Sequence, residues 1–172
     1  MPIREAESRA GLPELLLEHG RSRVRLSLQG AHVTGYSLHD DELLWVSQSA
    51  RYETGVAIRG GIPLCWPWFG ASLDNADWPQ HGFARTSRFR RVEERSDARE
   101  MSVILALDEA PAIPAWQGAA SLEVEIRLSD HLWMELRTVN LSDHDLPVGV
   151  GLHNYFRVSD CQTVSVPALT GL

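Results

Sequence analysis

Apolar residues occupy every second position in several short stretches of the chain. In ASLEVEIRLSD (120–130) the apolar positions are Leu122, Val124, Ile126 and Leu128. RVRLSLQG (23–30) follows the same rule. A period of two is that of a β-strand with one buried face, because successive side chains of a strand point to opposite sides. The same pattern predicts further strands at 31–39, 42–48, 101–109 and 131–142.

Short polar turns separate these stretches and predict that neighbouring strands run antiparallel. Asp130 and His131 lie between two of them, and residues 142–145 (SDHD) follow the last. No window shows a helical stripe with capping residues. Many short strands joined by turns indicate an all-β domain, either an antiparallel β-sandwich or a barrel. We expect residues 1–172 to form a single domain of this kind, because no linker, repeat or low-complexity tract divides them.

The charge of the chain limits its partners. Its 16 Lys and Arg residues are outnumbered by 23 Asp and Glu residues, and the formal net charge is −7. Binding to nucleic acids or to anionic membranes relies on a summed positive field, so neither partner is expected. A small anionic ligand would need a local cluster of arginines that works against the overall field.

The two cysteines and the N-terminal residues bear on the compartment. Cys65 and Cys161 are far apart and form no CxxC pair, which favours two buried free thiols in a reducing compartment over a disulfide or a metal site. The first residues, MPIREAESRAGLPE, contain no apolar signal-peptide core, and no apolar run is long enough to span a bilayer. These features predict a cytoplasmic protein.

Residues 49–83 depart from the alternating pattern. They are rich in Gly, Pro, Trp and Asp, and they include RGGIPLCWPWFG at 59–70. Gly60 and Gly61 permit a positive φ, while the two prolines each fix φ and remove a backbone donor. Long ordered loops inside compact domains are usually functional. We therefore predict a stiff, aromatic loop that directs Arg59 into a binding cleft.

Metal and nucleotide sites are disfavoured by the spacing of the residues that would form them. The seven histidines include no HxH or HxxxH pair, which are common spacings for two ligands on one element. No Gly-rich phosphate loop precedes a helix, so a nucleotide site has no support. The sequence predicts neither a metal ion nor an organic cofactor.

Three blocks concentrate the unusual residues: AIRGGIPLCWPWFG (57–70), PQHGFARTSRF (79–89) and VGVGLHNYFRVSD (148–160). In this order they resemble the aldose 1-epimerase superfamily, in its hexose-6-phosphate mutarotase (glucose-6-phosphate 1-epimerase) branch. The first two blocks are specific to this family, whereas LHNYF alone would be weak evidence for the resemblance. The resemblance extends over nearly the whole chain. It implies a β-sandwich of the galactose mutarotase-like supersandwich type and interconversion of the α and β anomers of a hexose 6-phosphate.

The resemblance assigns the catalytic acid to His153. Opening a sugar ring requires a general acid that protonates the ring oxygen and a general base that deprotonates the anomeric hydroxyl. Histidine suits the acid role because its ordinary pKa lies near the working pH. A lone histidine at the end of a strand is more often structural, and only the family match reverses that preference.

The resemblance also implies which residues bind the substrate: Arg59, Gln80, His81 and Arg85. A guanidinium offers a planar fork of donors that matches phosphate oxygens, and it stays charged. The alternatives are that Arg59 pairs with a carboxylate such as Glu53 and that Arg85 lies on a solvated strand edge.

Aromatic residues of the irregular segment are candidates for stacking on a sugar. The positions left open for this role are Trp68, Phe69 and Trp78, whose faces could match the apolar C–H face of a pyranose. Packing of the loop onto the sheet is the alternative, and it is the preferred interpretation for Trp66 and Phe83.

The general base has no counterpart in this sequence. In the family it is a glutamate near the C-terminal end of a longer chain, so we expect it beyond Leu172. None of Glu53, Asp74, Asp77 and Asp160 matches it. The resemblance thus predicts an apparently truncated sandwich, with the C-terminal portion absent, that would be a monomer at full length and whose partner is a small sugar phosphate. A non-catalytic sugar-phosphate binding module and an inactive fragment remain as rivals.

Overall fold

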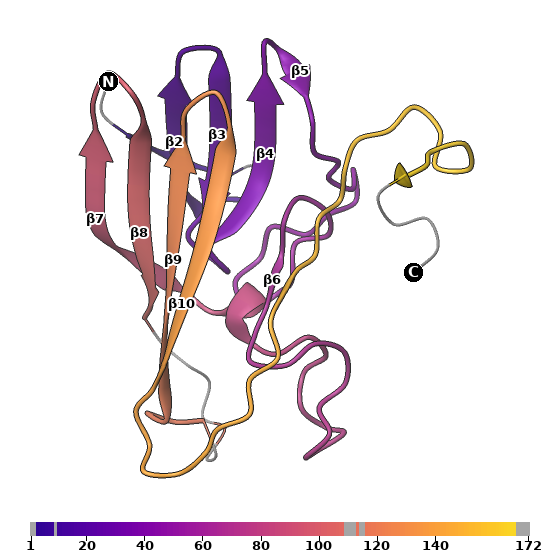
Figure 1. The fold of residues 1–172 in the computed structure, drawn as a ribbon. Coiled ribbons are helices and arrows are strands. Elements are labelled where there is room, and N and C mark those ends of the chain that lie inside the picture. Colours follow the sequence, from indigo (N-terminus) through magenta and orange to yellow (C-terminus); the bar gives the residue numbers. More distant parts are fainter. Residues whose placement is uncertain (1–2, 9, 109–112, 114–115, 168–172) are drawn as a thin grey trace.

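Two antiparallel sheets form the centre of the computed structural model, which describes residues 3–8, 10–108, 113 and 116–167 (Figure 1). The first sheet has the order β1–β2–β3–β4–β5, with β1 Arg4–Glu7, β2 Pro13–His19, β3 Ser22–Ser27, β4 His32–Leu38 and β5 Asp41–Glu42. The second has the order β10–β9–β8–β7, with β7 Phe89–Ser96, β8 Met101–Leu107, β9 Ala120–Leu128 and β10 Leu132–Asn140. A small third sheet pairs β6 Leu64–Cys65 with β11 Gly151–Leu152.

The described residues include a single short helical turn and no membrane-spanning helix. The turn is the 3₁₀ segment η1, Ala84–Thr86, which precedes β7. Within the described ranges, no helix is long and apolar enough to cross a membrane.

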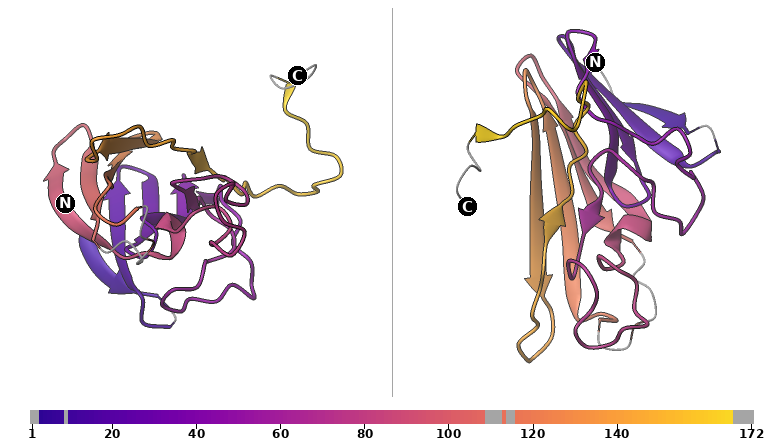
Figure 2. Two further views of the ribbon diagram at one scale, coloured as in Figure 1. Left: turned by 90° about the horizontal axis from the view of Figure 1, so that it is seen from below. Right: turned by 90° about the vertical axis from the view of Figure 1, so that its right-hand side faces the viewer.

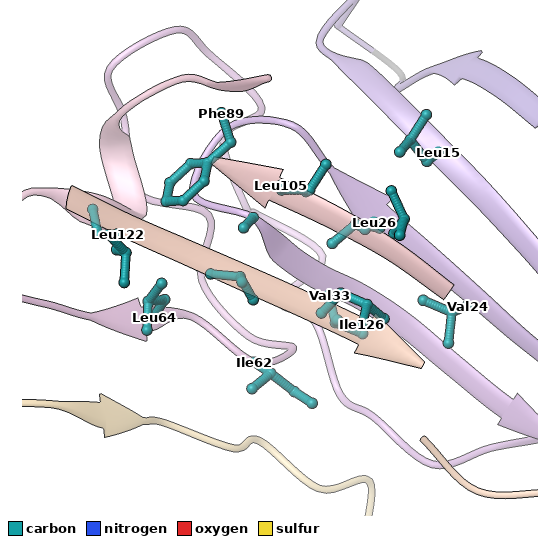
Figure 3. Packing of buried hydrophobic residues seen from close by; sticks show 14 of the residues in the cluster. Leu15, Val24, Leu26, Val33, Ile62, Leu64, Phe89, Leu105, Leu122 and Ile126 are labelled. Carbon is teal, nitrogen blue, oxygen red and sulfur yellow. The ribbon is translucent and has the colours of Figure 1, made fainter. Parts of the chain in front are cut away.

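The two larger sheets face each other, as the edge-on view of Figure 2 shows, and the apolar side of each is buried between them. Figure 3 shows side chains from both sheets meeting in this layer, among them Leu26 and Val33 from the first sheet and Leu105 and Ile126 from the second. All four are fully buried. The apolar positions of the alternating pattern are therefore the side chains that face inward, between the two sheets.

The prediction of an all-β antiparallel fold is confirmed, and five predicted strands are present. The stretches 23–30, 31–39, 101–109, 120–130 and 131–142 correspond to β3, β4, β8, β9 and β10. The inward face predicted for 120–130 is also confirmed, because the buried positions of β9 alternate with half-buried ones. Of the predicted ends, Glu109 lies outside the described residues.

The strand predicted at 42–48 is wrong. Only Glu42 belongs to a strand, and beyond it Leu44 and Val46 form isolated bridges with Phe156 and Gly60. These partners lie in irregular segments, so the pairing cannot continue as a ladder, although the local alternation is that of a strand. Conversely, the prediction missed three strands of the larger sheets: β1, β2 and β7. Strand β7 is an edge strand with mostly exposed residues and little alternation.

The irregular segment 49–83 contains one two-residue strand, β6, and it is fastened to η1 by a close contact. The Trp66 carbonyl accepts hydrogen bonds from Phe83 N–H (3.0 Å) and Ala84 N–H (3.1 Å). Gly82 has a φ of +70°, and a Cβ there would lie 2.0 Å from the Trp66 oxygen. Only glycine fits at this contact. Trp66 and Phe83 are both buried, as expected for aromatic residues that pack the loop onto the sheets.

The prediction of two buried thiols is correct for one cysteine. Both cysteines are free, but Cys65 is buried in β6 whereas Cys161 is exposed. Cys161 lies in a turn beyond Arg157, where the chain runs away from the two sheets (Figure 2). The exposure of Cys161 follows from this position.

A pair of glycine substitutions tests the Gly82 contact. Gly118 has a similar φ of +72°, but no atom lies within 4 Å of its hypothetical Cβ. Gly118→Ala should therefore lower the free energy of unfolding only by the left-handed strain of about 1–2 kcal/mol. Gly82→Ala should lower it by a further ~1–3 kcal/mol, since the methyl group meets backbone. Urea unfolding measures both, and equal losses would show that the Trp66 contact is looser than described.

Candidate active site

Two segments that are far apart in sequence meet at β6 and β11, and their pairing holds the predicted acid. Beyond the paired strands, His153 N–H donates to the Pro63 carbonyl at 3.1 Å, and Tyr155 N–H donates to the Gly61 carbonyl at 2.9 Å. The LHNYF block thus runs alongside the start of the irregular segment. The backbone of residues 61–65 therefore fixes the position of the His153 backbone.

The imidazole of His153 is nearly parallel to two neighbouring aromatic rings. Its centroid lies 4.8 Å from that of Tyr155, at an interplanar angle of 27°, and 6.2 Å from that of Phe69, at 17°. The side chain is half-buried, and its Nδ1 is a buried atom without a hydrogen-bond partner among the described residues. The neighbouring rings restrict rotation of the imidazole, so Tyr155 and Phe69 help to set its orientation.

His81 joins two loops through a pair of hydrogen bonds to one residue. The backbone N–H of His81 donates to the Gly70 carbonyl at 2.6 Å, and the ring Nδ1 of His81 accepts from the backbone N–H of Gly70 at 3.1 Å. Because Nδ1 is an acceptor, the proton of the neutral ring resides on Nε2. Burial lowers the pKa of His81, and the charges of Arg85 and His153 lower it further. The two imidazole centroids are 6.1 Å apart.

Arg85 brings a permanent positive charge close to His81. It lies in η1, is half-buried, and donates from Nη2 to the Gln80 carbonyl at 2.7 Å. This bond closes the loop that carries Gln80 and His81. It occupies one of five guanidinium donors, which leaves donors for a ligand. Arg85 therefore does not lie on a solvated strand edge.

Arg59 and Gln80 are exposed residues of the surrounding loops. The suggested pairing of Arg59 with Glu53 is absent, because Glu53 binds Arg51 at 2.6 Å and 3.0 Å. Among the described residues, no carboxylate forms an ion pair with Arg59. The Arg59 backbone is held more firmly, since its carbonyl accepts from Ser47 N–H at 3.0 Å.

The candidate stacking residues differ in how they are packed. Trp68 and Trp78 stack on each other at 5.5 Å, both pack against the core, and Trp68 Nε1–H donates to the Pro79 carbonyl at 2.9 Å. Phe69 is 56% exposed and lies 4.9 Å from the His81 ring. Of these three, Phe69 is the most exposed, and it lies beside both histidines.

His32 was not singled out in the sequence, yet it supports the loop that carries Arg59. It is completely buried at the start of β4, and its Nε2 lies 2.7 Å from the Gly60 carbonyl. A carbonyl only accepts, so Nε2 must carry the proton. Burial lowers the pKa of His32 to about 4, with a smaller contribution from Arg85 that acts in the same direction. In the sequence His32 is an ordinary position of an alternating strand, with no motif to mark it.

An apolar cavity lies next to these residues and does not contain them. Its volume is about 520 Å³, and its wall includes Leu44, Ile62 and, from β10, Leu132 and Met134. Leu152 and Asn154 reach it, but His153 is not part of its lining. The structure thus brings His153, His81, Phe69 and Arg85 together beside, rather than inside, this cavity.

Comparison with known proteins gives one family for this chain. The model of the aldose 1-epimerase family matches residues 13–172. A "putative glucose-6-phosphate 1-epimerase" of Escherichia coli is 32% identical over 167 residues, which are 94% of this chain and 55% of the relative. A protein of the same name from Cenchrus ciliaris is 30% identical, over 93% of this chain and 51% of its own length. The chain therefore spans about half the length of the curated relatives that it matches.

Solved structures show the same architecture. A "putative mutarotase" from Salmonella typhimurium has a TM-score of 0.81 at 28% identity, over 92% of this chain and 52% of that one. A galactose mutarotase-like protein from Clostridium acetobutylicum has a TM-score of 0.71 at 17% identity, over 90% and 53%. The second similarity is one of fold alone.

The buried neutral state of His32 predicts a pH dependence of stability. As the pH falls from 6.5 to about 4, the unfolded chain binds a proton at His32 that the folded protein excludes. The folded state therefore loses stability across this window, by about 3 kcal/mol at pH 4. In His32→Gln this part of the decline should disappear.

Urea unfolding of both proteins at pH 7 and at pH 4 measures the difference. The carboxylates titrate in both proteins and cancel in the comparison. An equal decline in the two proteins would mean that His32 is protonated in the folded state.

Proposed function

The chain belongs to the aldose 1-epimerase family, and on that premise we propose that the protein interconverts the α and β anomers of a hexose 6-phosphate. The observation that carries the proposal is the placement of the His153 and His81 rings 6.1 Å apart, with the Arg85 charge close enough to lower the pKa of His81. In this proposal His153 exchanges a proton, His81 donates a hydrogen bond, and Arg85 binds an anion.

In the proposed reaction His153 delivers a proton to the ring oxygen. A base removes the proton of the anomeric hydroxyl at the same time, and the bond between the anomeric carbon and the ring oxygen breaks to give the open-chain aldehyde. Rotation about the adjacent carbon–carbon bond presents the other face of the aldehyde. Closure returns the protons in reverse. A positioned acid or base of this kind contributes about 10²–10⁴-fold to the rate.

His81 and Phe69 would hold the sugar beside His153. Because Nδ1 of His81 is occupied by Gly70 N–H, the free Nε2–H is a donor that can bind a sugar oxygen. The exposed face of Phe69 can pack against the C–H groups of a pyranose. Gln80 on the same loop could add an amide contact. These roles fix the position of the ring, which is needed for proton transfer over a short distance.

Arg85 and Arg59 are the proposed contacts to the 6-phosphate. The chain as a whole carries a net charge of −7, so an anion can be held only where arginines are concentrated. Arg85 has free guanidinium donors, and Arg59 has no carboxylate partner among the described residues. The names of the two curated relatives, which refer to glucose 6-phosphate, support this choice of substrate.

The general base is not assigned to any described carboxylate. The family resemblance implies a glutamate from a later part of the family's chain, and the present chain spans 55% of its Escherichia coli relative. A protein that binds sugar phosphates without catalysing anomer exchange is the rival function. Exchange and binding must therefore be measured separately.

The proposed reaction moves only protons and reforms one carbon–oxygen bond. No atom is oxidised or reduced, so the proposal includes neither a redox cofactor nor a metal ion. Phosphate esters carry charges that do not cross a bilayer unaided. We accordingly propose an enzyme of the cytoplasm, and we propose that it is a monomer at full length.

His153→Ala should abolish catalysed anomer exchange and leave sugar-phosphate binding within about twofold, because the acid is lost while the arginines remain. Exchange of glucose 6-phosphate is followed by NMR, and binding by titration calorimetry, with the protein as its gene encodes it. Exchange at close to the parental rate would disprove the role of His153. Binding without exchange in the parental protein would favour the rival function.

Removing Arg59 or Arg85 should weaken binding of glucose 6-phosphate by about 1.5–3 kcal/mol, the value of a hydrogen bond to a charged group. Binding of glucose should change much less. Arg90→Ala is the matched control, because Arg90 is an exposed arginine of β7 whose loss changes the net charge equally. Equal losses for glucose and for its phosphate would show that the two arginines are structural.

A further inference from the structure

Two buried polar side chains hold the loop that leads to Arg59, which we define as residues 53–61. The first is Gln29, which follows β3 and is 6% exposed. Its Nε2 donates to the carbonyls of Glu53 (3.1 Å) and Val56 (2.9 Å), and its Oε1 accepts from Gly55 N–H at 2.8 Å. Its side-chain amide thus fastens the first turn of the loop.

The second side chain holds the opposite end of the same loop. His32, at the start of β4, donates from Nε2 to the Gly60 carbonyl at 2.7 Å. The residue after Gly60 is fitted equally closely, since a Cβ on Gly61 would lie 2.3 Å from the Val33 oxygen and 3.0 Å from His32 Nε2. The loop is therefore fixed to strand β4 immediately after Arg59.

Arg59 itself lies between these two attachments. Its carbonyl accepts from Ser47 N–H at 3.0 Å, and Gly61 N–H donates to the Trp45 carbonyl at 2.8 Å. Its side chain is exposed and has no ion pair among the described residues. The position from which this side chain extends is therefore set by the backbone, which Gln29 and His32 contact on either side of Arg59.

Stability alone does not explain this choice of residues. Taking a histidine and an amide out of water carries a desolvation cost, and His32 retains a buried Nδ1 without a partner among the described residues. Departures from an apolar interior are expected where a site must be held in one geometry. The cost is offset if a fixed backbone at Arg59 reduces the ordering that ligand binding requires.

We infer that Gln29 and His32 are positioning residues that hold Arg59 for an anionic substrate group. This inference rests on the proposed function, because it takes Arg59 to be a phosphate contact. Both residues act through Arg59 and do not touch the ligand. Their effect should therefore be confined to the phosphorylated sugar and should require Arg59.

The test is a double-mutant cycle in the protein as its gene encodes it, with glucose 6-phosphate and glucose as ligands. Gln29→Glu keeps the acceptor for Gly55 N–H but replaces the amide donor by an oxygen. His32→Leu removes the donor to Gly60, whereas His32→Gln retains an amide donor of similar reach. Each is measured alone and combined with Arg59→Ala by titration calorimetry.

We expect Gln29→Glu and His32→Leu to weaken binding of glucose 6-phosphate by about 3–10-fold, the range for lost hydrogen bonds, and binding of glucose by less than about twofold. In the Arg59→Ala background neither should weaken binding further, and His32→Gln should recover most of the affinity. If His32→Leu does not fold, as judged by circular dichroism, Gln29→Glu decides the matter alone.

Two results would overturn the inference and can be told apart. Losses that are equal for both ligands, or that add to that of Arg59→Ala, would show that Gln29 and His32 are merely structural while the proposed function stands. A parental protein that binds glucose 6-phosphate no better than glucose would overturn the phosphate site itself, and the inference with it.

Discussion

Burial of one face of each large sheet against the other is the constraint on which the rest of the molecule depends. Leu26 and Val33 from the first sheet and Val124 and Ile126 from the second have no exposed surface. Removal of such apolar area from water is the main favourable term in folding. The irregular segment is joined to the same layer through Trp66, which is itself buried. A stiff platform is thereby provided for loops that have little regular structure of their own.

The candidate site brings together three basic side chains, those of Arg85, His81 and His153, in a chain with a net negative charge. Arg85 is always charged, whereas burial and the neighbouring charges lower the pKa of His81. A neutral His81 can donate from Nε2 without adding to the repulsion around Arg85. An anionic group bound beside Arg85 would supply a negative charge and would raise the pKa of His81. Such an anion would oppose the effect that the Arg85 charge has on His81.

Local periodicity predicted the strands that have one buried and one more exposed face. The sequence motifs predicted which residues lie together in the candidate site. Strand β9 alternates strictly because one side faces the core, so its sequence carries the whole signal. Residues 42–48 alternate as well, but their partners are irregular and the strand does not form. The blocks around His81, Arg85 and His153 identified the candidate site through the family resemblance. Spacing alone would not have done so.

By itself the sequence determined the all-β class, the inward faces and the residues of the three motifs, because these follow from local pattern and composition. Only the tertiary structure decided how the motifs are held. Gln29 contacts a turn that begins 24 residues later, and His32 contacts Gly60, 28 residues away. The tertiary structure likewise decided that Phe69 is exposed whereas its neighbour Trp68 is half-buried. Such contacts depend on where the chain returns in space, which no local pattern records.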